Sequence, residues 1–517
     1  MQSGLTFVDG CVVVFYFSFV ALVAFYVSGG QRTTRDYFLG GRSLPWWAAA
    51  FSIIATETSA VTLLGTPRKA YQGDWSFLQM VCGFVLGRLF LAFFFVQAFY
   101  RAEYITVYGL LERSFGGMAR TVAAVLFLVG RVLGSGVRLY AGCLALEAAT
   151  GIRIELAICL LGAFGTLYTL VGGIRAVVWT DILLGLTFMA GGVASALYIA
   201  SALPGGLQSL ISSPELGAKI AILRPGVDLA RDDTLLAGLA GGFVLTLATH
   251  GTDQDVVQRM LTCRDSRSGS LSVLGSAVMI LPLMTLYLAV GTLLYFFYKS
   301  SSPAYELPRN LDHLFPVFVA RELPRGFAGF VLAGLLAATV SSFTSVLNAL
   351  ASTVVSDFYL PLERRLGRRS TESQLLGVSR GATLALGAVL IAVAVGCIGG
   401  NANILDVALK TLNYFYGALL GAFLLAIFTR RGSAGSVTAG MVLSVPAVLV
   451  FQLQEYLVKP EAAPDAVRSL ILRLPEAVQH AVREHVPPLA WPYWIIVGTA
   501  VTLAVGSLGR RGSVERP

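Results

Sequence analysis

Hydroxyl side chains gather in the middle of an otherwise apolar stretch, residues 334–357, which reads GLLAATVSSFTSVLNALASTVVSD. Ser341 and Ser345 are four residues apart, so in a helix they share a face, and Ser342 lies about 100° round the axis from Ser341. Hydroxyl and carbonyl oxygens bind a hard cation such as sodium without adding charge to the membrane interior. The alternative is structural, because small hydroxyl residues also let two membrane helices approach closely.

A second apolar run, residues 45–66, is interrupted near its midpoint by five polar residues. They are Thr56, Glu57, Thr58, Ser59 and Thr62. A carboxylate at mid-membrane costs at least about 2.5 kcal/mol on insertion, so Glu57 is a candidate functional group that faces an interior cavity. The alternative is a structural glutamate that is hydrogen-bonded to a neighbouring helix or protonated.

Further charged residues fall inside apolar runs. Arg131 and Arg138 are seven residues apart, two turns along one helix face. We expect one of them to neutralise an intramembrane acid such as Glu57 and the other to hold an anionic substrate, with a structural role as the alternative for each. Asp181 lies about a turn and a half inside its helix, where it is either functional or a first-turn acid at the positive end of the helix dipole. Earlier in the chain, the run at 75–100 carries Gln79 and Arg88.

The run at 233–258 is also broken, by a polar segment that contains a glycine. This segment comprises Thr249, His250, Gly251, Thr252 and Asp253. Two broken helices five spans apart indicate an inverted-repeat transporter, in which the two breaks meet at the membrane midplane. In the run 402–428, Asp406 and Lys410 have the spacing of a local ion pair, and Asn413 and Tyr414 either line a pocket or pack structurally.

These residues need a membrane scaffold, and the composition predicts one. Of 517 residues, 56% are hydrophobic and 13% charged, and apolar runs long enough to span a bilayer recur along the chain. We predict an all-α polytopic membrane protein of about 13 helices with a five-plus-five inverted-repeat core. The expected parts are a peripheral N-terminal helix (1–30), the first repeat (31–232), the second repeat (233–433), and additional helices with a short tail (434–517).

The net charge of +9 is a topology signal and does not indicate a nucleic-acid partner. Arginines crowd the short loops on one side of the predicted membrane, and Arg259 is counted with them, whereas the short loops on the other side hold only Arg68, Lys69 and Arg153. The positive-inside rule then places the N-terminus outside and the C-terminus in the cytoplasm of a plasma (inner) membrane protein. The six cysteines lack the spacing of a metal site or a disulfide framework.

Several motifs together resemble the sodium:solute symporter family over roughly residues 30–430. They are RDYFLGGRSLPWW, ATETSAVTLLGTP, YGLLERSFG, GGIRAVVWTD and AATVSSFTSVLNALASTVVSDFY. The resemblance implies a sodium site between the broken helix and the Ser-rich helix, formed by the carbonyls of Ala55, Thr58 and Ala338 and the hydroxyls of Ser341 and Ser342. It also implies a second sodium site, found in some members, at Asp181, Thr344 and Ser345.

We therefore expect a symporter that couples sodium to import of a small polar or anionic solute, with no organic cofactor and a monomeric functional unit. The expected solute-binding side chains are Glu57, Thr62, Gln79, Arg138, Thr249, Asn413 and Tyr414. Glu57 and Thr62 stand where sugar-binding members of the family have Asn and Gln, which argues against a sugar as the transported solute. The alternatives are proton coupling through Glu57 or Asp181 and a transporter-like sensor, whereas an enzyme is not expected, because no catalytic motif is present.

Overall fold

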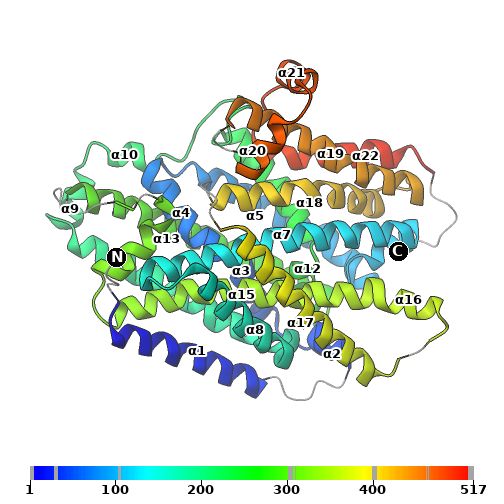
Figure 1. The fold of residues 1–517 in the computed structure, drawn as a ribbon, viewed down its shortest axis with the longest axis horizontal. Helices are drawn as coiled ribbons and strands as arrows, with labels where there is room; N and C mark the ends of the chain where they lie inside the picture. The colour runs from blue at the N-terminus through cyan, green and yellow to red at the C-terminus, as the bar shows by residue number, and fades with distance from the viewer. Residues whose placement is uncertain are drawn as a thin grey trace.

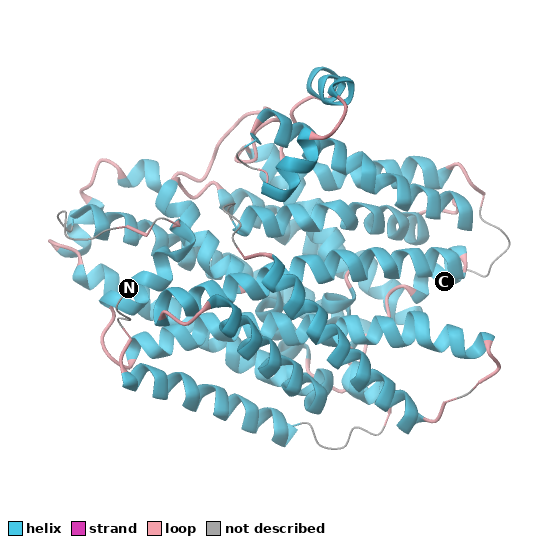
Figure 2. Ribbon diagram, viewed as in Figure 1, coloured by secondary structure: helices cyan, strands magenta, loops and turns pink. Residues whose placement is uncertain are grey.

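The computed structural model describes residues 5–27, 33–102, 106–300, 307–308, 310–368, 370–398, 404–460, 463 and 465–510. Within these ranges every regular element is helical, and β-type pairing is limited to the isolated bridges Leu44–Cys263 and Arg431–Arg510. Figure 2 shows the same arrangement, with helices joined by short loops. The predicted all-α fold class is confirmed.

The long helices lie side by side in one bundle (Figure 1). They are α1 (Phe7–Val27), α5 (Phe77–Ala102), α7 (Gly117–Thr150), α8 (Ile154–Ala202), α13 (Ser266–Ser300), α15 (Phe327–Thr353), α17 (Glu372–Gly396), α18 (Ile404–Phe428), α19 (Ala434–Val458) and α22 (Trp494–Ser507). Shorter helices are α2 (Thr34–Leu39), α3 (Trp46–Glu57), α4 (Ala60–Gln72), α6 (Gly109–Phe115), α11 (Gly242–Gly251), α12 (Gln254–Leu261), α14 (Leu314–Glu322), α16 (Leu360–Arg365), α20 (Asp465–Leu472) and α21 (Glu476–His485).

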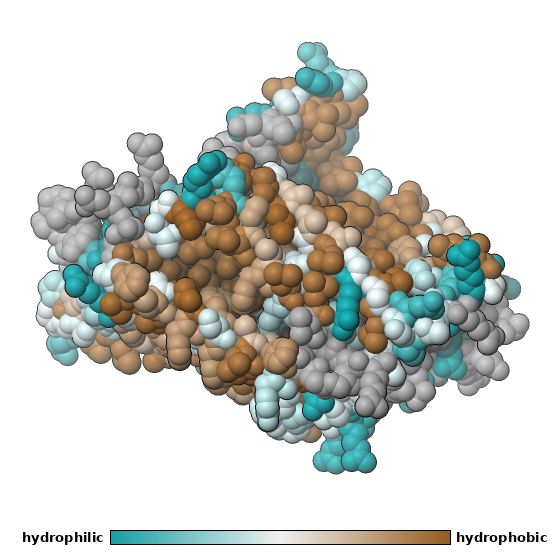
Figure 3. Space-filling view, turned by 60° about the horizontal axis from the view of Figure 1, so that its bottom comes forward, coloured by the Kyte–Doolittle hydropathy of each residue, from teal (hydrophilic) through white to brown (hydrophobic). Residues whose placement is uncertain are grey.

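The described helices fit a polytopic membrane protein. Nine of them are long and apolar enough to cross a membrane, and α3 with α4 makes a tenth if the pair is one broken span. Within α8, Gly173 takes the non-helical angles φ 54° and ψ −170°, which divide this 49-residue helix into two segments. Figure 3 shows hydrophobic side chains over the middle of the visible face and hydrophilic ones toward its edges. The exact number of thirteen spans stays a prediction.

The Ser-rich helix α15 is the centre of the bundle. In its most apolar window 94% of the residues are buried, against 11% for α1. It packs against α8, α7, α3 and α1. Its contact with α7 depends on Gly142, where an added Cβ would lie 1.9 Å from Thr339 Oγ1. A helix enclosed on all sides cannot satisfy its hydroxyls with water, so their partners must come from the surrounding helices.

The first helix, α1, is mostly exposed, and it has a structural role at the start of α15. Asp9 Oδ1 accepts hydrogen bonds from the backbone N–H groups of Gly326 (2.7 Å) and Gly329 (2.9 Å). These N–H groups belong to the first turn of α15, where a helix has no internal acceptors. The carboxylate therefore caps α15 from a neighbouring helix.

Both predicted breaks are present. The axes of α3 and α4 differ by 64° across residues 58 and 59. α11 ends at Gly251 and α12 begins at Gln254, with Asp253 as its N-cap accepting from Asp255 N at 2.8 Å. α12 packs against both α3 and α15, so the second break reaches the same interior as the first. The proposed repeat boundaries stay predictions.

Candidate functional site

The break between α3 and α4 frees backbone carbonyls in the interior. In a continuous helix the amide of Ser59 would bond the Ala55 carbonyl, but it donates to the Glu57 carbonyl at 3.1 Å. The amide of Thr62 would bond the Thr58 carbonyl, but it donates to the Ser59 carbonyl at 2.9 Å. Ala55 and Thr58 are fully buried. Their carbonyl oxygens are therefore left without helical partners in a dry environment, where a cation is the natural ligand.

The hydroxyls of α15 face this break. Ser342 Oγ donates to the Ala338 carbonyl at 2.9 Å and lies 3.4 Å from the Thr56 carbonyl on α3. Ser341 Oγ donates to Asp181 Oδ1 at 2.5 Å. The hydroxyl of Thr58 is buried without a hydrogen-bond partner in the described structure. The residues predicted for the first sodium site thus supply neutral oxygens from two facing elements.

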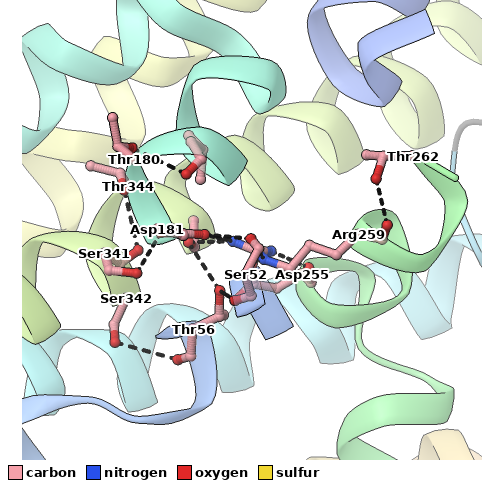
Figure 4. A network of polar contacts seen from close by, with 12 residues as sticks. Ser52, Thr56, Thr180, Asp181, Asp255, Arg259, Thr262, Ser341, Ser342 and Thr344 are labelled. Carbon is pink, nitrogen blue, oxygen red and sulfur yellow. Dashed lines mark hydrogen bonds and ion pairs between the residues drawn. The ribbon is translucent and has the colours of Figure 1, made fainter. Parts of the chain in front are cut away.

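Asp181 on α8 joins three other elements, as Figure 4 shows. It is fully buried, and its carboxylate accepts hydrogen bonds from Ser52 of α3 and Ser341 of α15. The guanidinium of Arg259 on α12 lies 3.5 Å from Asp181 Oδ2. Asp181 is therefore well inside the bundle and is not a solvated first-turn acid.

Arg259 corrects the sequence analysis, which counted it with the charges of an inner loop. Its side chain is fully buried in α12. Nε donates to Ser52 Oγ at 2.9 Å, Nη1 donates to Asp255 Oδ1 at 2.7 Å, and Nη2 donates to Ser345 Oγ. The missed signal was the i, i+4 spacing of Asp255 and Arg259 immediately after the break, which predicts an ion pair on one helix face.

The buried ion pairs also differ from the expected ones. Glu57 pairs with Arg88 of α5, and neither Arg131 nor Arg138 contacts it in the described ion pairs. Arg131 instead pairs with Asp255 and lies 3.3 Å from Asp253. The expectation that one α7 arginine neutralises an intramembrane acid is confirmed, but the acids are those of the second break. Sequence spacing could not identify these partners, because they lie on distant segments.

A cavity lies between the two breaks and is lined by polar and apolar side chains. The polar lining consists of Thr56, Glu57, Ser59, Thr62, Arg131, Arg138, Thr246, Thr249, His250 and Asp253. The apolar lining consists of Val61, Phe77, Phe84, Leu245, Val256, Ile280, Met284 and Leu412. Of the predicted solute-binding residues, Glu57, Thr62, Arg138 and Thr249 therefore face one space. Such a mixture of apolar walls and a few polar groups is typical of small-molecule sites.

Arg138 is the cavity arginine that has no carboxylate partner among the described ion pairs. Its Nη1 is buried without a hydrogen-bond partner in the described structure. Arg131, in contrast, is held by two aspartates. A guanidinium left unpaired at low dielectric is costly, so the geometry favours a ligand that carries a negative charge.

Three predicted solute-binding residues do not line this cavity. Gln79 donates to the Asp233 carbonyl at 3.0 Å and accepts from Arg224 N at 3.1 Å, so it holds the loop that contains Arg224 and Asp233. Asn413 donates to the Trp491 carbonyl at 2.9 Å, and Tyr414 donates to Gln452 and stacks on Trp494. The Asn413 amide nitrogen and the Tyr414 hydroxyl therefore bond the C-terminal segments.

Lys410 was predicted to pair with Asp406, but in the described structure it pairs with Glu455. Its ammonium contacts Glu455 Oε1 of α19 at 2.7 Å. The side chain of Asp406 lies outside the described residues. Lys410 therefore links α18 to α19 and is not among the residues that line the cavity.

The sequence of this chain matches the sodium:solute symporter family over residues 37–443. It is 28% identical to the sodium/sialic acid symporter SiaT of Proteus mirabilis, over 86% of this chain and 89% of that protein. It is 31% identical to a putative sodium-dependent multivitamin transporter of Drosophila melanogaster, over 81% and 70% of the two chains. It is also 30% identical to the human sodium/iodide cotransporter, over 80% and 64%.

Two solved structures are similar in fold. A sodium-coupled sialic acid symporter in a substrate-bound outward-open state superposes with a TM-score of 0.84 at 24% identity, covering 99% of each chain. Mhp1, a nucleobase-cation-symport-1 family transporter, superposes with a TM-score of 0.57 at 13% identity, covering 91% of this chain and 92% of that one. The helical arrangement of this chain is thus similar to that of these two proteins.

Proposed function

Because this chain belongs to the sodium:solute symporter family, we propose that it imports a small organic monoanion, a carboxylate, together with sodium. It is a transporter and not an enzyme, and sodium is its coupling ion. The relatives named above transport solutes such as sialic acid and iodide, which are anions at neutral pH. The proposal concerns the solute class and the residues that bind it.

The observation that carries the proposal is the unpaired guanidinium of Arg138 in the cavity. The other charges of the lining are compensated by neighbours, Glu57 by Arg88 and Arg131 by Asp253 and Asp255. Glu57, paired in this way, does not repel an anion as a free carboxylate would. A carboxylate group of the solute would bond Arg138, while Thr62 and Thr249 offer hydrogen bonds to its polar atoms.

We propose that sodium binds where the broken helix meets α15. The freed carbonyls of Ala55 and Thr58, the Ala338 carbonyl and the hydroxyls of Ser341 and Ser342 would coordinate it. All are neutral oxygens, which suits an ion that must leave in every cycle. The ion would brace α3 against α15 and favour the conformation that accepts the solute from outside. Its release inside would remove the brace.

The energetics follow from the charges that move. One sodium ion with one monoanion carries no net charge, so the membrane potential does no net work on the pair. A tenfold sodium gradient would then supply about 1.4 kcal/mol, enough for roughly tenfold accumulation. A neutral solute would also gain about 2.3 kcal/mol per 100 mV, which corresponds to roughly five-hundredfold accumulation in total. Voltage dependence therefore distinguishes the two solute classes.

The test begins with a thermal-shift screen of the purified protein against carboxylates, halides, amino acids and sugars, with and without sodium. We expect a carboxylate to stabilise the protein only when sodium is present. Uptake of that carboxylate by Arg138→Gln should show a KM raised about 10- to 100-fold, because a charge-assisted hydrogen bond is lost. A sugar that is taken up with the carboxylates inactive, or an unchanged KM in Arg138→Gln, would contradict the proposal.

We further propose a plasma-membrane location with the N-terminus outside, the C-terminus in the cytoplasm and a monomer as the functional unit. The arginine-rich short loops support this orientation. In Figure 1, α1 begins at the left end of the bundle and α22 ends at the right end, which agrees with opposite sides for the two termini. Labelling of single cysteines introduced before α1 and after α22 would test it.

A further inference from the structure

A groove separates part of α1 from the first segment of α8. It is lined by seven residues of these two helices, namely Ala21, Ala24, Phe25, Phe164, Leu167, Tyr168 and Gly172. Its volume is about 220 Å³, which exceeds the roughly 150 Å³ of an apolar cavity that binds benzene. Except for the Tyr168 hydroxyl, the lining side chains carry no polar group. The groove therefore suits part of a hydrocarbon chain and not a polar solute.

The groove exists because α1 and α8 meet closely along only part of their length. Val20 and Ala24 are buried in one apolar cluster with Tyr168 of α8. Beside this contact, Ala21 and Gly172 have side chains too short to fill the space between the two helices. An empty space between packed helices loses dispersion contacts on both of its walls, so a filler is favoured.

The groove lies on a face that a bilayer must cover. Only 11% of the most apolar window of α1 is buried, and at the groove Phe25 is 73% exposed and Leu167 is 62% exposed. Among the described helices α1 contacts α8 and α15, and Figure 1 shows it along the lower edge of the bundle. In a membrane the neighbouring material is lipid, so hydrocarbon is the filler that the surroundings supply.

A positive charge and aromatic rings mark the headgroup level near one end of the groove. Arg175 follows the lining residue Gly172 by three residues, a distance of at most about 11 Å along the chain. Its side chain is exposed and takes part in none of the described ion pairs. Trp179 packs on Trp47, with ring centroids 5.8 Å apart, and Trp47 is 43% exposed. Tryptophan favours the membrane interface, and arginine pairs with phosphate.

We propose that this groove binds one phospholipid, with an acyl chain between α1 and α8 and the phosphate on Arg175. Two helices wall the groove, so a chain inside it contacts more atoms than one on the open surface of the bundle. The site uses none of the residues proposed for sodium or solute. In the orientation proposed above, the lipid belongs to the cytoplasmic leaflet.

The bound lipid would also support the bend of α8. Gly173, with φ 54°, divides α8 directly after the groove. Thr180, beyond the bend, donates its hydroxyl to the Ala176 carbonyl at 2.9 Å, so Tyr168, before the bend, donates to Thr180. The Tyr168 ring lines the groove and stacks on Phe164, with centroids 6.3 Å apart. An acyl chain against this ring restrains the contact that joins the two segments of α8.

The test is native mass spectrometry of the purified full-length protein, delipidated and titrated with palmitoyl-oleoyl-phosphatidylglycerol. We expect one lipid to bind more tightly than the next ones. Ala21→Phe fills the groove and should weaken this first binding at least about tenfold, because contact with two or more methylene groups is lost. The matched control is Leu22→Phe, which should bind as the parent does, because Leu22 is 66% exposed and does not line the groove.

The headgroup contact has its own variant. Arg175→Gln should weaken the first binding about two- to fivefold, because solvent screens an exposed charge pair. Arg365→Gln, at an exposed arginine that ends α16, is its control and should leave binding unchanged. Unchanged binding in Arg175→Gln would overturn the role of this arginine. Inorganic phosphate should not displace the lipid, and displacement would overturn the acyl-chain site.

A phosphatidylglycerol with a photoreactive group on its acyl chain locates the site even if Ala21→Phe does not fold. We expect cross-links within residues 21–25 and 164–172. Cross-links spread evenly over the lipid-facing helices would overturn the proposal. Equal affinity of successive lipids, or an equal effect of Ala21→Phe and Leu22→Phe, would also overturn it.

Discussion

The first broken helix and the second broken helix meet in the same interior but present different chemistry. Between α3 and α4 the groups near α15 are neutral, namely the freed carbonyls of Ala55 and Thr58 and the hydroxyl of Ser342. Between α11 and α12 and along α12 they are charged, with Asp253, Asp255 and other charged groups held in ion pairs. One break offers dipoles and the other offers charges.

The difference fits the two roles that we propose, reversible binding of sodium at the first break and lasting ion pairs at the second. Neutral oxygens bind sodium without creating a buried charge when the ion leaves, so they suit reversible binding. Opposite charges in a dry interior are hard to separate, because removing one partner leaves the other buried and uncompensated. The charged break therefore suits contacts that persist through the cycle. Three further variants test this comparison.

The largest effect is expected at the charged break. Arg131→Met leaves Asp253 and Asp255 short of a guanidinium, which should cost about 3–5 kcal/mol of stability. The measurement is the thermal unfolding midpoint and the yield of monodisperse protein. The matched control is Arg153→Met, because the Arg153 side chain is 84% exposed and its contact with Glu155 is 3.5 Å long. Equal stability of the two variants would show that the ion pairs of Arg131 do not stabilise the bundle.

An intermediate effect is expected at the neutral break. In the double variant Ser341→Ala and Ser342→Ala, the sodium concentration for half-maximal uptake should rise at least about tenfold, because two oxygens are lost from the proposed shell. Stability should fall less than in Arg131→Met. The control is Ser352→Ala, also on α15, whose buried hydroxyl bonds only the Ala349 carbonyl of its own helix among the described contacts (2.8 Å). If sodium stimulated uptake by the double variant as strongly as uptake by the parent, these serines would not be part of the sodium site.

The smallest effect is expected for an ion pair at the edge of the bundle. Asp74, between α4 and α5, accepts hydrogen bonds from Ser76 N and Arg224 Nε, both at 2.9 Å. Burial opposes ionisation, but these hydrogen bonds and the Arg224 guanidinium lower the pKa of Asp74. Because Arg224 is 44% exposed, solvent screens the pair, and Asp74→Asn should cost at most about 1 kcal/mol.

The pH dependence gives this prediction a sign. A carboxylate whose pKa is lowered by folding contributes stability above its unfolded pKa and loses it as the pH falls through the folded value. The difference in unfolding midpoint between the parent and Asp74→Asn should therefore be largest near neutral pH and shrink below about pH 4. A difference that grows on acidification would show that Asp74 acts in another way.

Much of the fold was predictable because the membrane restricts it. Long apolar runs must be helices in lipid, and polar interruptions such as ATETS and ATHGTDQD must face the interior. The serines of α15 belong to the same class, since hydroxyls in the middle of an apolar helix need protein partners. Local rules thus identified both breaks, the hydroxyl-rich helix and several residues that line the cavity.

The pairing of charges was not predictable in this way. Sequence position placed Arg259 just beyond a span, where an arginine is usually solvated, and only the packing of α12 against α3 and α15 buries it. The partner of Glu57 proved to be Arg88 of α5, because the packing of the helices brings these two side chains into direct contact. Gln79 is polar within an apolar run, yet its side chain bonds the loop that contains Arg224 and Asp233 and does not line the cavity.

The sequence by itself determined that this protein is a bundle of membrane helices with two interior breaks, since lipid tolerates few other structures and hydropathy is local information. Only the tertiary structure decided which arginine faces which carboxylate, and hence which guanidinium in the cavity, that of Arg138, has no carboxylate partner among the described ion pairs. The physical reason is that the energy of a buried charge depends on its neighbours within a few ångströms, and those neighbours come from distant segments of the chain.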